Sequence, residues 1–276
     1  MIKKIIFAGC SITAGNELWE EAHVPNYASM TFKESRKMMG NVPNYQEVNE
    51  YNKQHAFPIL VGKELGVETV NLGFPGISNK ELALRVIAHF TEDHYDDTMV
   101  VMQLTTHNRM LLRYKEEENK QNTIGSFVVM PNADDDRLSK NQNNLLKEMF
   151  LEFLPESLMA ADDHIFFYYA VEVLKEKGIP VYVLWTDIEI VDWANWDINN
   201  GYDDAGKYTI VNDKDPQWCE MISKHFTRKH HTVNLLGTTL QKLAGSDSRL
   251  PRLHFKKSAH ETIATHISEK LKCLIG

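Results

Sequence analysis

The chain has 276 residues, which is long enough to bury a substantial core. Hydrophobic residues make up 43% and charged residues 25%, a composition that excludes a disordered or fibrous protein. The formal net charge of -8 gives no basic footprint for phosphates, so the composition disfavours nucleic acid as a partner.

Cysteine usage and hydropathy bear on the compartment. Cys10, Cys219 and Cys273 are far apart and form no C-x-x-C pair, so we expect neither a disulfide framework nor a cysteine metal site. No run approaches the roughly 20 apolar residues that span a bilayer, and residues 2–8 are too short for a signal h-region. We therefore expect a cytoplasmic protein without membrane contact.

Strand-like and helix-like segments alternate along the chain. Short apolar runs bounded by Gly, Asn or Pro predict strands buried on both faces, and apolar positions three to four residues apart predict amphipathic helices. The alternation predicts an α/β fold in one domain over residues 1–276, a three-layer α/β/α sandwich around a flavodoxin-like parallel sheet. In chain order the segments are strand 5–8, helix 49–65, strand 67–72, helix 79–90, strand 99–104, helix 155–177, strand 179–185, strand 232–236 and helix 258–274.

Two long segments are insertions that a minimal α/β/α sandwich does not need. Residues 109–153 are polar, with a helix predicted over 139–153, and residues 187–218 are acidic and rich in aromatic residues such as Trp193 and Trp196. Insertions of this length usually form lids or binding surfaces.

The first strand breaks at Gly9-Cys10-Ser11. A strand-to-helix turn would present the Ser11 hydroxyl at the carboxyl edge of the sheet, where a neighbouring base could activate it as a nucleophile. The alternatives are a plain turn in which Ser11 or Thr13 caps a helix, and a nucleophilic Cys10 in place of the serine. A lone Cys10 is more commonly a buried packing residue.

A glycine-rich turn, Asn71-Leu72-Gly73-Phe74-Pro75-Gly76, follows the second strand. Glycine allows backbone N–H groups to approach an oxyanion, although such a turn can also simply lead into a helix capped by Ser78 or Asn79.

His254 precedes the last helix, and Ile263-Ala264 follow nine residues later. Together with the Gly9-Cys10-Ser11 turn, this layout resembles the SGNH (GDSL-like) hydrolases. The resemblance implies an α/β esterase in which Ser11 is the nucleophile and His254 is the base. The chain departs from the family pattern at Cys10 and Pro251, where the family has Asp, and at Phe255, where it has Pro.

The same resemblance implies an oxyanion hole. Its donors would be the backbone N–H groups of Ser11 and Gly76 and a side chain at the end of the third strand. Asn108 supplies the expected amide if one residue is inserted, whereas direct counting selects His107. Arg109 would bind an anionic substrate group or pair with an acid in the following insertion.

The acid that normally orients the histidine is missing from its usual position. Asp247 is the nearest carboxylate on the N-terminal side and would serve if its loop folds inward. A backbone carbonyl could instead orient His254 in a Ser-His dyad, or catalysis has been lost. His260, the competing histidine, falls inside the last predicted helix, where packing or capping is the expected role.

We therefore expect a hydrolase of small esters, most of all O-acetyl esters of carbohydrates, with Trp193 and Trp196 stacking on the sugar. The sequence predicts no cofactor and no metal, and it gives no prediction of oligomeric state. Alternatives are an inactive SGNH-like binding or assembly protein, and an acyl or glycosyl transferase on the same scaffold.

Overall fold

The computed structural model describes residues 1–38, 44–90, 95, 97–105, 110–115, 124–129, 138–153, 156–186, 234–252 and 254–275. Among them lies no helix both long and apolar enough to cross a membrane.

The centre of the molecule is a five-stranded parallel sheet in the order β2-β1-β3-β6-β7. This is the flavodoxin-like order, and it confirms the predicted fold class. Four strands lie within two residues of their predicted bounds, and the last begins two residues late and ends three residues late. The strands are β1 (Lys4–Ala8), β2 (Glu68–Asn71), β3 (Thr98–Leu104), β6 (Val181–Trp185) and β7 (Asn234–Thr239).

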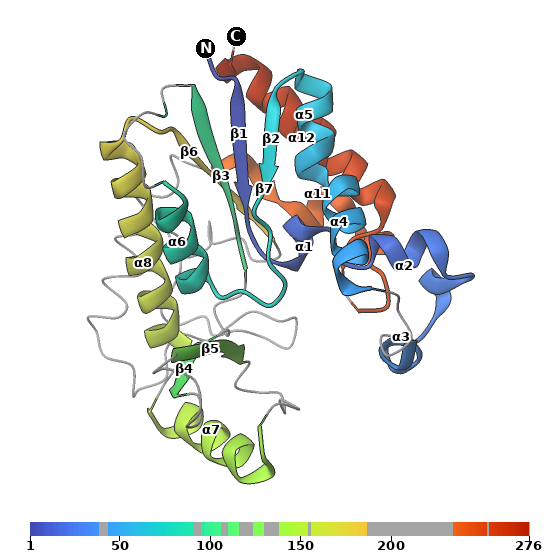
Figure 1. Cartoon of the computed structure of the whole chain (residues 1–276), viewed down its shortest axis with the longest axis vertical. Helices are drawn as coiled ribbons and strands as arrows, with labels where there is room; N and C mark the ends of the chain where they lie inside the picture. The colour runs from blue at the N-terminus through green and yellow to red at the C-terminus, as the bar shows by residue number, and fades with distance from the viewer. Residues whose placement is uncertain are drawn as a thin grey trace, which may run out of the picture.

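Helices cover both faces of the sheet, as Figure 1 shows. On one face α6 (Asn79–His89) packs against α8 (Glu156–Glu176), and on the other α5 (Phe57–Leu65) packs against α12 (Lys257–Ile275). α11 (Leu240–Ala244) lies beside α12.

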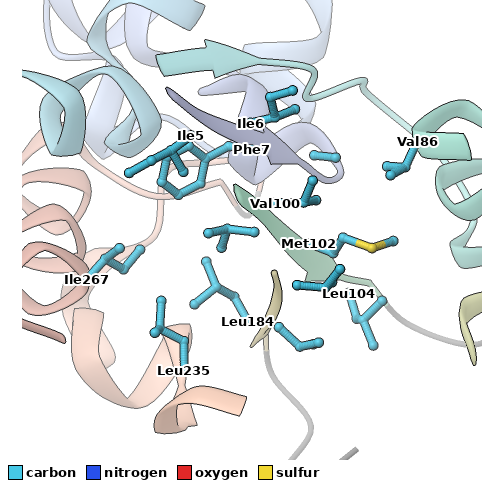
Figure 2. Close-up of a cluster of buried hydrophobic side chains, with 14 of the residues drawn as sticks. Ile5, Ile6, Phe7, Val86, Val100, Met102, Leu104, Leu184, Leu235 and Ile267 are labelled. Atoms are coloured by element: carbon cyan, nitrogen blue, oxygen red, sulfur yellow. The ribbon is translucent and has the colours of Figure 1, made fainter. Parts of the chain in front are cut away.

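The core is formed between these layers. Side chains of β1 alternate between the two faces, so that Phe7 meets the ring of Phe57 from α5 edge-on at 5.8 Å. β3 is buried along its whole length, as expected for a central parallel strand. Figure 2 shows Ile267 of α12 and Val86 of α6 on opposite sides of the strands.

The helix predicted over residues 49–65 is two helices. α4 (Tyr45–His55) ends at Ala56, whose extended backbone separates it from α5. Pro58 lies in the first turn of α5, where its missing N–H costs no helical hydrogen bond. The break therefore lies at Ala56, just before the helix that contains Pro58, and the apolar pattern alone did not reveal it.

Short elements fill the connection between β1 and α4: α1 (Ser11–Ala14), α2 (Leu18–His23), the 3-10 turn η1 (Tyr27–Ser29) and α3 (Phe32–Met38). A second 3-10 turn, η3 (Ser246–Ser248), follows α11.

In the first insertion, β4 (Met110–Lys115) and β5 (Ile124–Val129) pair antiparallel, and α7 (Lys140–Phe153) confirms the predicted helix. These elements lie beyond the carboxyl edge of the main sheet (Figure 1). The second insertion, 187–218, falls outside the described residues.

Candidate active site

Ser11 is the first residue of α1, at the carboxyl end of β1. β1 lies between β2 and β3, so the turn sits where the chain changes direction across the sheet, the usual location of ligand sites in such folds. Cys10 occupies the N-cap position without a side-chain cap, and neither Ser11 nor Thr13 caps the helix. Ser11 is buried, with 7% of the residue exposed.

A buried glutamine fixes the turn from below. Gln103 of β3 accepts hydrogen bonds at Oε1 from the backbone N–H of Cys10 (3.1 Å) and the hydroxyl of Thr13 (2.7 Å). Its Nε2 donates to Thr186 at the end of β6. Cys10 is buried in contact with the same amide, its Sγ lying 3.3 Å from Oε1, as expected for a packing cysteine.

The glycine-rich turn after β2 is bound to the same site. The Asn71 side chain donates to the carbonyl of Thr13 (2.8 Å) and accepts from the N–H of Gly73 (2.9 Å). A Cβ at Gly73 would lie 2.3 Å from the backbone nitrogen of Ala14, so only glycine permits this approach to α1. Gly76 adopts φ +76°, and Ser78 caps α6.

The end of β3 is held by the neighbouring helices. The Asn79 side chain bonds both backbone groups of Thr105, at 2.9 and 3.0 Å, and donates to the carboxylate of Asp163 on α8 (3.0 Å). The residues predicted at this strand end, His107, Asn108 and Arg109, lie outside the described residues, as do Trp193 and Trp196.

His254 lies in a tight loop just before α12. The loop is closed by hydrogen bonds from the N–H of Leu250 to the carbonyl of His254 and from the N–H of Lys256 to the carbonyl of Ser248, both 2.7 Å. Within the described residues, Ser11 Oγ and the His254 ring are not hydrogen-bonded to each other. Catalytic contacts are often long before substrate binds, so this separation is compatible with a base.

Glu17 holds the histidine in place, and sequence analysis missed it. Its Oε2 lies 2.6 Å from His254 Nδ1 and accepts from the backbone N–H of the same residue (3.1 Å). The N–H of Asn16 donates to the carbonyl of Ser11 (3.0 Å), so Glu17 directly follows the serine turn. The structure thereby brings the C-terminal histidine onto the segment that follows the proposed nucleophile.

Asp247 lies exposed in η3, and among the described residues it forms no hydrogen bond or ion pair with His254. Within the same loop the Ser248 hydroxyl donates to the carbonyl of Gly245 (2.6 Å), and the exposed Asp247 carboxylate does not fold inward, which its role as the orienting acid would require.

Burial by itself would raise the pKa of Glu17. The hydrogen bond and charge of His254, with hydrogen bonds from Tyr27 and the backbone of Arg252, outweigh burial and lower that pKa below its usual value. The carboxylate is therefore ionised at neutral pH, and an ionised acceptor requires the proton of the His254 ring to lie on Nδ1.

His260 lies in α12, as predicted, and packs in the core. Its Nδ1 accepts from the backbone N–H of Phe57 (3.2 Å), and its ring lies against Phe57 and Phe255. Burial, aided by the charge of His254, lowers the pKa of His260 to about 3, so the ring stays neutral.

Comparison with known proteins gives matches among solved structures. No family model and no curated protein matches the sequence. A G-D-S-L family lipolytic protein from Desulfitobacterium hafniense matches with 12% identity, coverage of 98% of this chain and 99% of its own, and a TM-score of 0.44. A lipase/acylhydrolase from Enterococcus faecalis matches with 13% identity, coverage of 99% of this chain and 97% of its own, and a TM-score of 0.44.

A catalytic variant of an acetylxylan esterase from Geobacillus stearothermophilus gives 12% identity, coverage of 98% of this chain and 94% of its own, and a TM-score of 0.40. These solved structures share 12 to 13% of their residues with this chain, at TM-scores of 0.40 to 0.44.

Proposed function

We propose that the protein is an SGNH-type esterase in which Ser11 is the nucleophile and His254 the base. One observation carries the proposal: His254 is docked on the segment that follows Ser11, with its Nδ1 bound to an ionised carboxylate at 2.6 Å. A histidine held in this way leaves Nε2 as the free, basic nitrogen that a serine hydroxyl requires.

The reaction would proceed in two halves. Ser11 Oγ attacks the ester carbonyl carbon while its proton passes to His254 Nε2. The tetrahedral intermediate then expels the alcohol, which takes that proton from His254. In the second half, His254 Nε2 removes a proton from water, and the resulting hydroxide attacks the acyl-serine. The acid is released, and His254 passes its proton to the Ser11 oxygen.

The oxyanion would be stabilised by donors fixed in advance. The backbone N–H groups of Ser11 and Gly76 are our candidates, because the hydrogen bonds of Asn71 tie the loop containing Gly76 to α1. Asn108, or His107 in the alternative register, would complete the hole from the end of β3, which Asn79 anchors through Thr105.

For the substrate we propose an O-acetyl ester of a carbohydrate. The segment 187–218 carries Trp193 and Trp196, whose rings can stack on sugars, and Arg109 could bind an anionic substituent.

A fluorophosphonate probe tests the nucleophile directly. We expect the wild-type protein to be labelled at one site and Ser11→Ala to lose labelling, while Cys10→Ala keeps it. The matching activity assay is hydrolysis of p-nitrophenyl acetate and of acetylated xylo-oligosaccharides. Absence of labelling in the folded wild-type protein would contradict the proposal, and loss of labelling only in Cys10→Ala would move the nucleophile to the thiol.

A further inference from the structure

We infer that Glu17 is the positioning residue of the active site, the carboxylate that orients His254 from the segment after the nucleophile. The inference rests on the proposed function. It differs from the sequence prediction, which placed the acid at Asp247 on the histidine's own loop.

The contact has the geometry of an orienting acid. Glu17 Oε2 accepts from both the backbone N–H and the Nδ1 of His254, at 3.1 and 2.6 Å, so it fixes the position and the rotation of the imidazole together. The Glu17 side chain is fully buried, whereas the His254 side chain is 18% exposed. The carboxylate lies behind the ring, and the ring keeps access to solvent.

A second set of residues holds the carboxylate itself. Glu17 Oε1 accepts from the hydroxyl of Tyr27 (2.6 Å) and the backbone N–H of Arg252 (3.0 Å). Arg252 donates from Nε to the Tyr27 hydroxyl (3.1 Å) and pairs with Glu20. Both carboxylate oxygens of Glu17 therefore accept hydrogen bonds, which fix the position of the side chain.

The charges of this cluster suit catalysis. Two carboxylates, Glu17 and Glu20, face one guanidinium, that of Arg252. With a neutral His254 the cluster carries one uncompensated negative charge, and with a protonated His254 it carries none. Formation of the imidazolium during the reaction is thus favoured by a charge already in place.

The backbone of Glu17 supports the same conclusion. Its φ is +73°, a left-handed conformation that is unusual for a residue with a side chain. Such conformations persist where surrounding contacts over-determine them, and they cluster at functional sites. Here the four hydrogen bonds to the carboxylate supply that constraint.

Kinetics of three variants separate Glu17 from its rival. Glu17→Gln keeps the size of the side chain and removes its charge, and we expect kcat to fall by on the order of 10³- to 10⁴-fold. Glu17→Asp keeps a shortened carboxylate and should recover part of that loss. Asp247→Asn tests the rival acid: a loss of kcat in Asp247→Asn with full activity in Glu17→Gln would overturn the inference.

The tautomer of His254 gives a readout that a purely structural role would not move. In ¹⁵N-histidine NMR at neutral pH, we expect the neutral His254 ring to carry its proton on Nδ1, with its resonance assigned from a His254→Asn sample. Glu17→Gln should shift the population toward the Nε2–H form. Tyr27→Phe, the structural control, removes one bond to Glu17 and should lower stability without changing the tautomer.

The two proposals fail differently. If wild-type protein shows the Nδ1–H form but neither probe labelling nor ester turnover, the esterase proposal is wrong and the positioning contact stands. If wild-type protein is labelled but the tautomer and kcat are unchanged in a folded Glu17→Gln, Glu17 is not the positioning residue.

Discussion

At the scale of single residues, Gln103 links the nucleophile turn to the sheet. Its buried amide connects β3 to the start of α1, through Cys10 and Thr13, and to Thr186 at the end of β6. Buried polar groups of this kind are costly when left unpaired, so the network stabilises the turn only while all its members are present.

Gln103→Leu removes the amide while keeping most of the side-chain volume. We expect the free energy of unfolding to fall by at least about 2 kcal/mol, because the Cys10 N–H and the hydroxyls of Thr13 and Thr186 lose a partner inside the core. Urea unfolding measures the change. Thr13→Ser retains the hydroxyl and should cost clearly less than Gln103→Leu; equal stabilities of Gln103→Leu and wild type would show that the network contributes nothing.

At the scale of elements, α4 supports α2, the short helix that follows Glu17. The buried Asn52 side chain of α4 accepts from the backbone N–H of Trp19 in α2 (2.7 Å). Aromatic side chains add to this contact between α2 and α4: Trp19 is stacked on His23 in α2, and Tyr51 is stacked on His55 in α4. The two pairs meet edge-on between His23 and Tyr51 at 4.9 Å.

Asn52→Ala should loosen α2 and the Glu17 carboxylate together. The Trp19 N–H loses its acceptor, so we expect the free energy of unfolding to fall by about 1–3 kcal/mol. The esterase kcat should fall by more than the smaller fraction of folded protein explains. Amide hydrogen exchange at Trp19 reports the local opening. Asn52→Asp preserves the accepting oxygen and should retain slow exchange there; fast exchange already in wild type would exclude this support.

At the scale of the whole molecule, stability should depend on pH through His260. In the unfolded chain its pKa is near 6.5, whereas in the folded protein burial lowers the pKa to about 3. Between these two pKa values only the unfolded state binds the proton. The contribution of the neutral His260 ring to stability is therefore complete above pH 6.5 and is lost as the pH falls toward 3.

Wild-type protein should therefore lose stability on acidification by about 1.4 kcal/mol per pH unit from this group alone. His260→Asn keeps an acceptor for the Phe57 N–H but cannot titrate, so its free energy of unfolding should depend less steeply on pH between 4 and 6. Denaturant unfolding across that range measures both slopes. Equal slopes would mean that another group dominates.

Glu17 also makes the stability sensitive to acid, because its pKa is lowered in the folded protein. Its stabilising effect is present above the unfolded value of 4.5 and disappears as the pH falls through the folded value. The effects of His260 and Glu17 on stability overlap below pH 4.5, so the loss of stability should steepen there.

Much of the scaffold was predictable because the signals that specify it are local. β3 is mostly apolar and is buried throughout, and the spacing of Ile263, Ile267 and Leu271 correctly predicts the buried face of α12. The positions of Ser11 and His254 at the ends of predicted elements were also local information. The β4–β5 pair was not predicted: its strands carry short apolar runs, such as Phe127-Val128-Val129, inside an insertion that is polar as a whole.

The tertiary structure alone decided which carboxylate meets His254. Glu17 is 237 positions away from that histidine and stands in no recognisable motif, whereas Asp247 is near in sequence but exposed. Strand and helix periodicity follow from contacts between near neighbours, which a sequence displays directly. The partner of the His254 imidazole follows from how distant segments pack, and that is set only when the whole chain has folded.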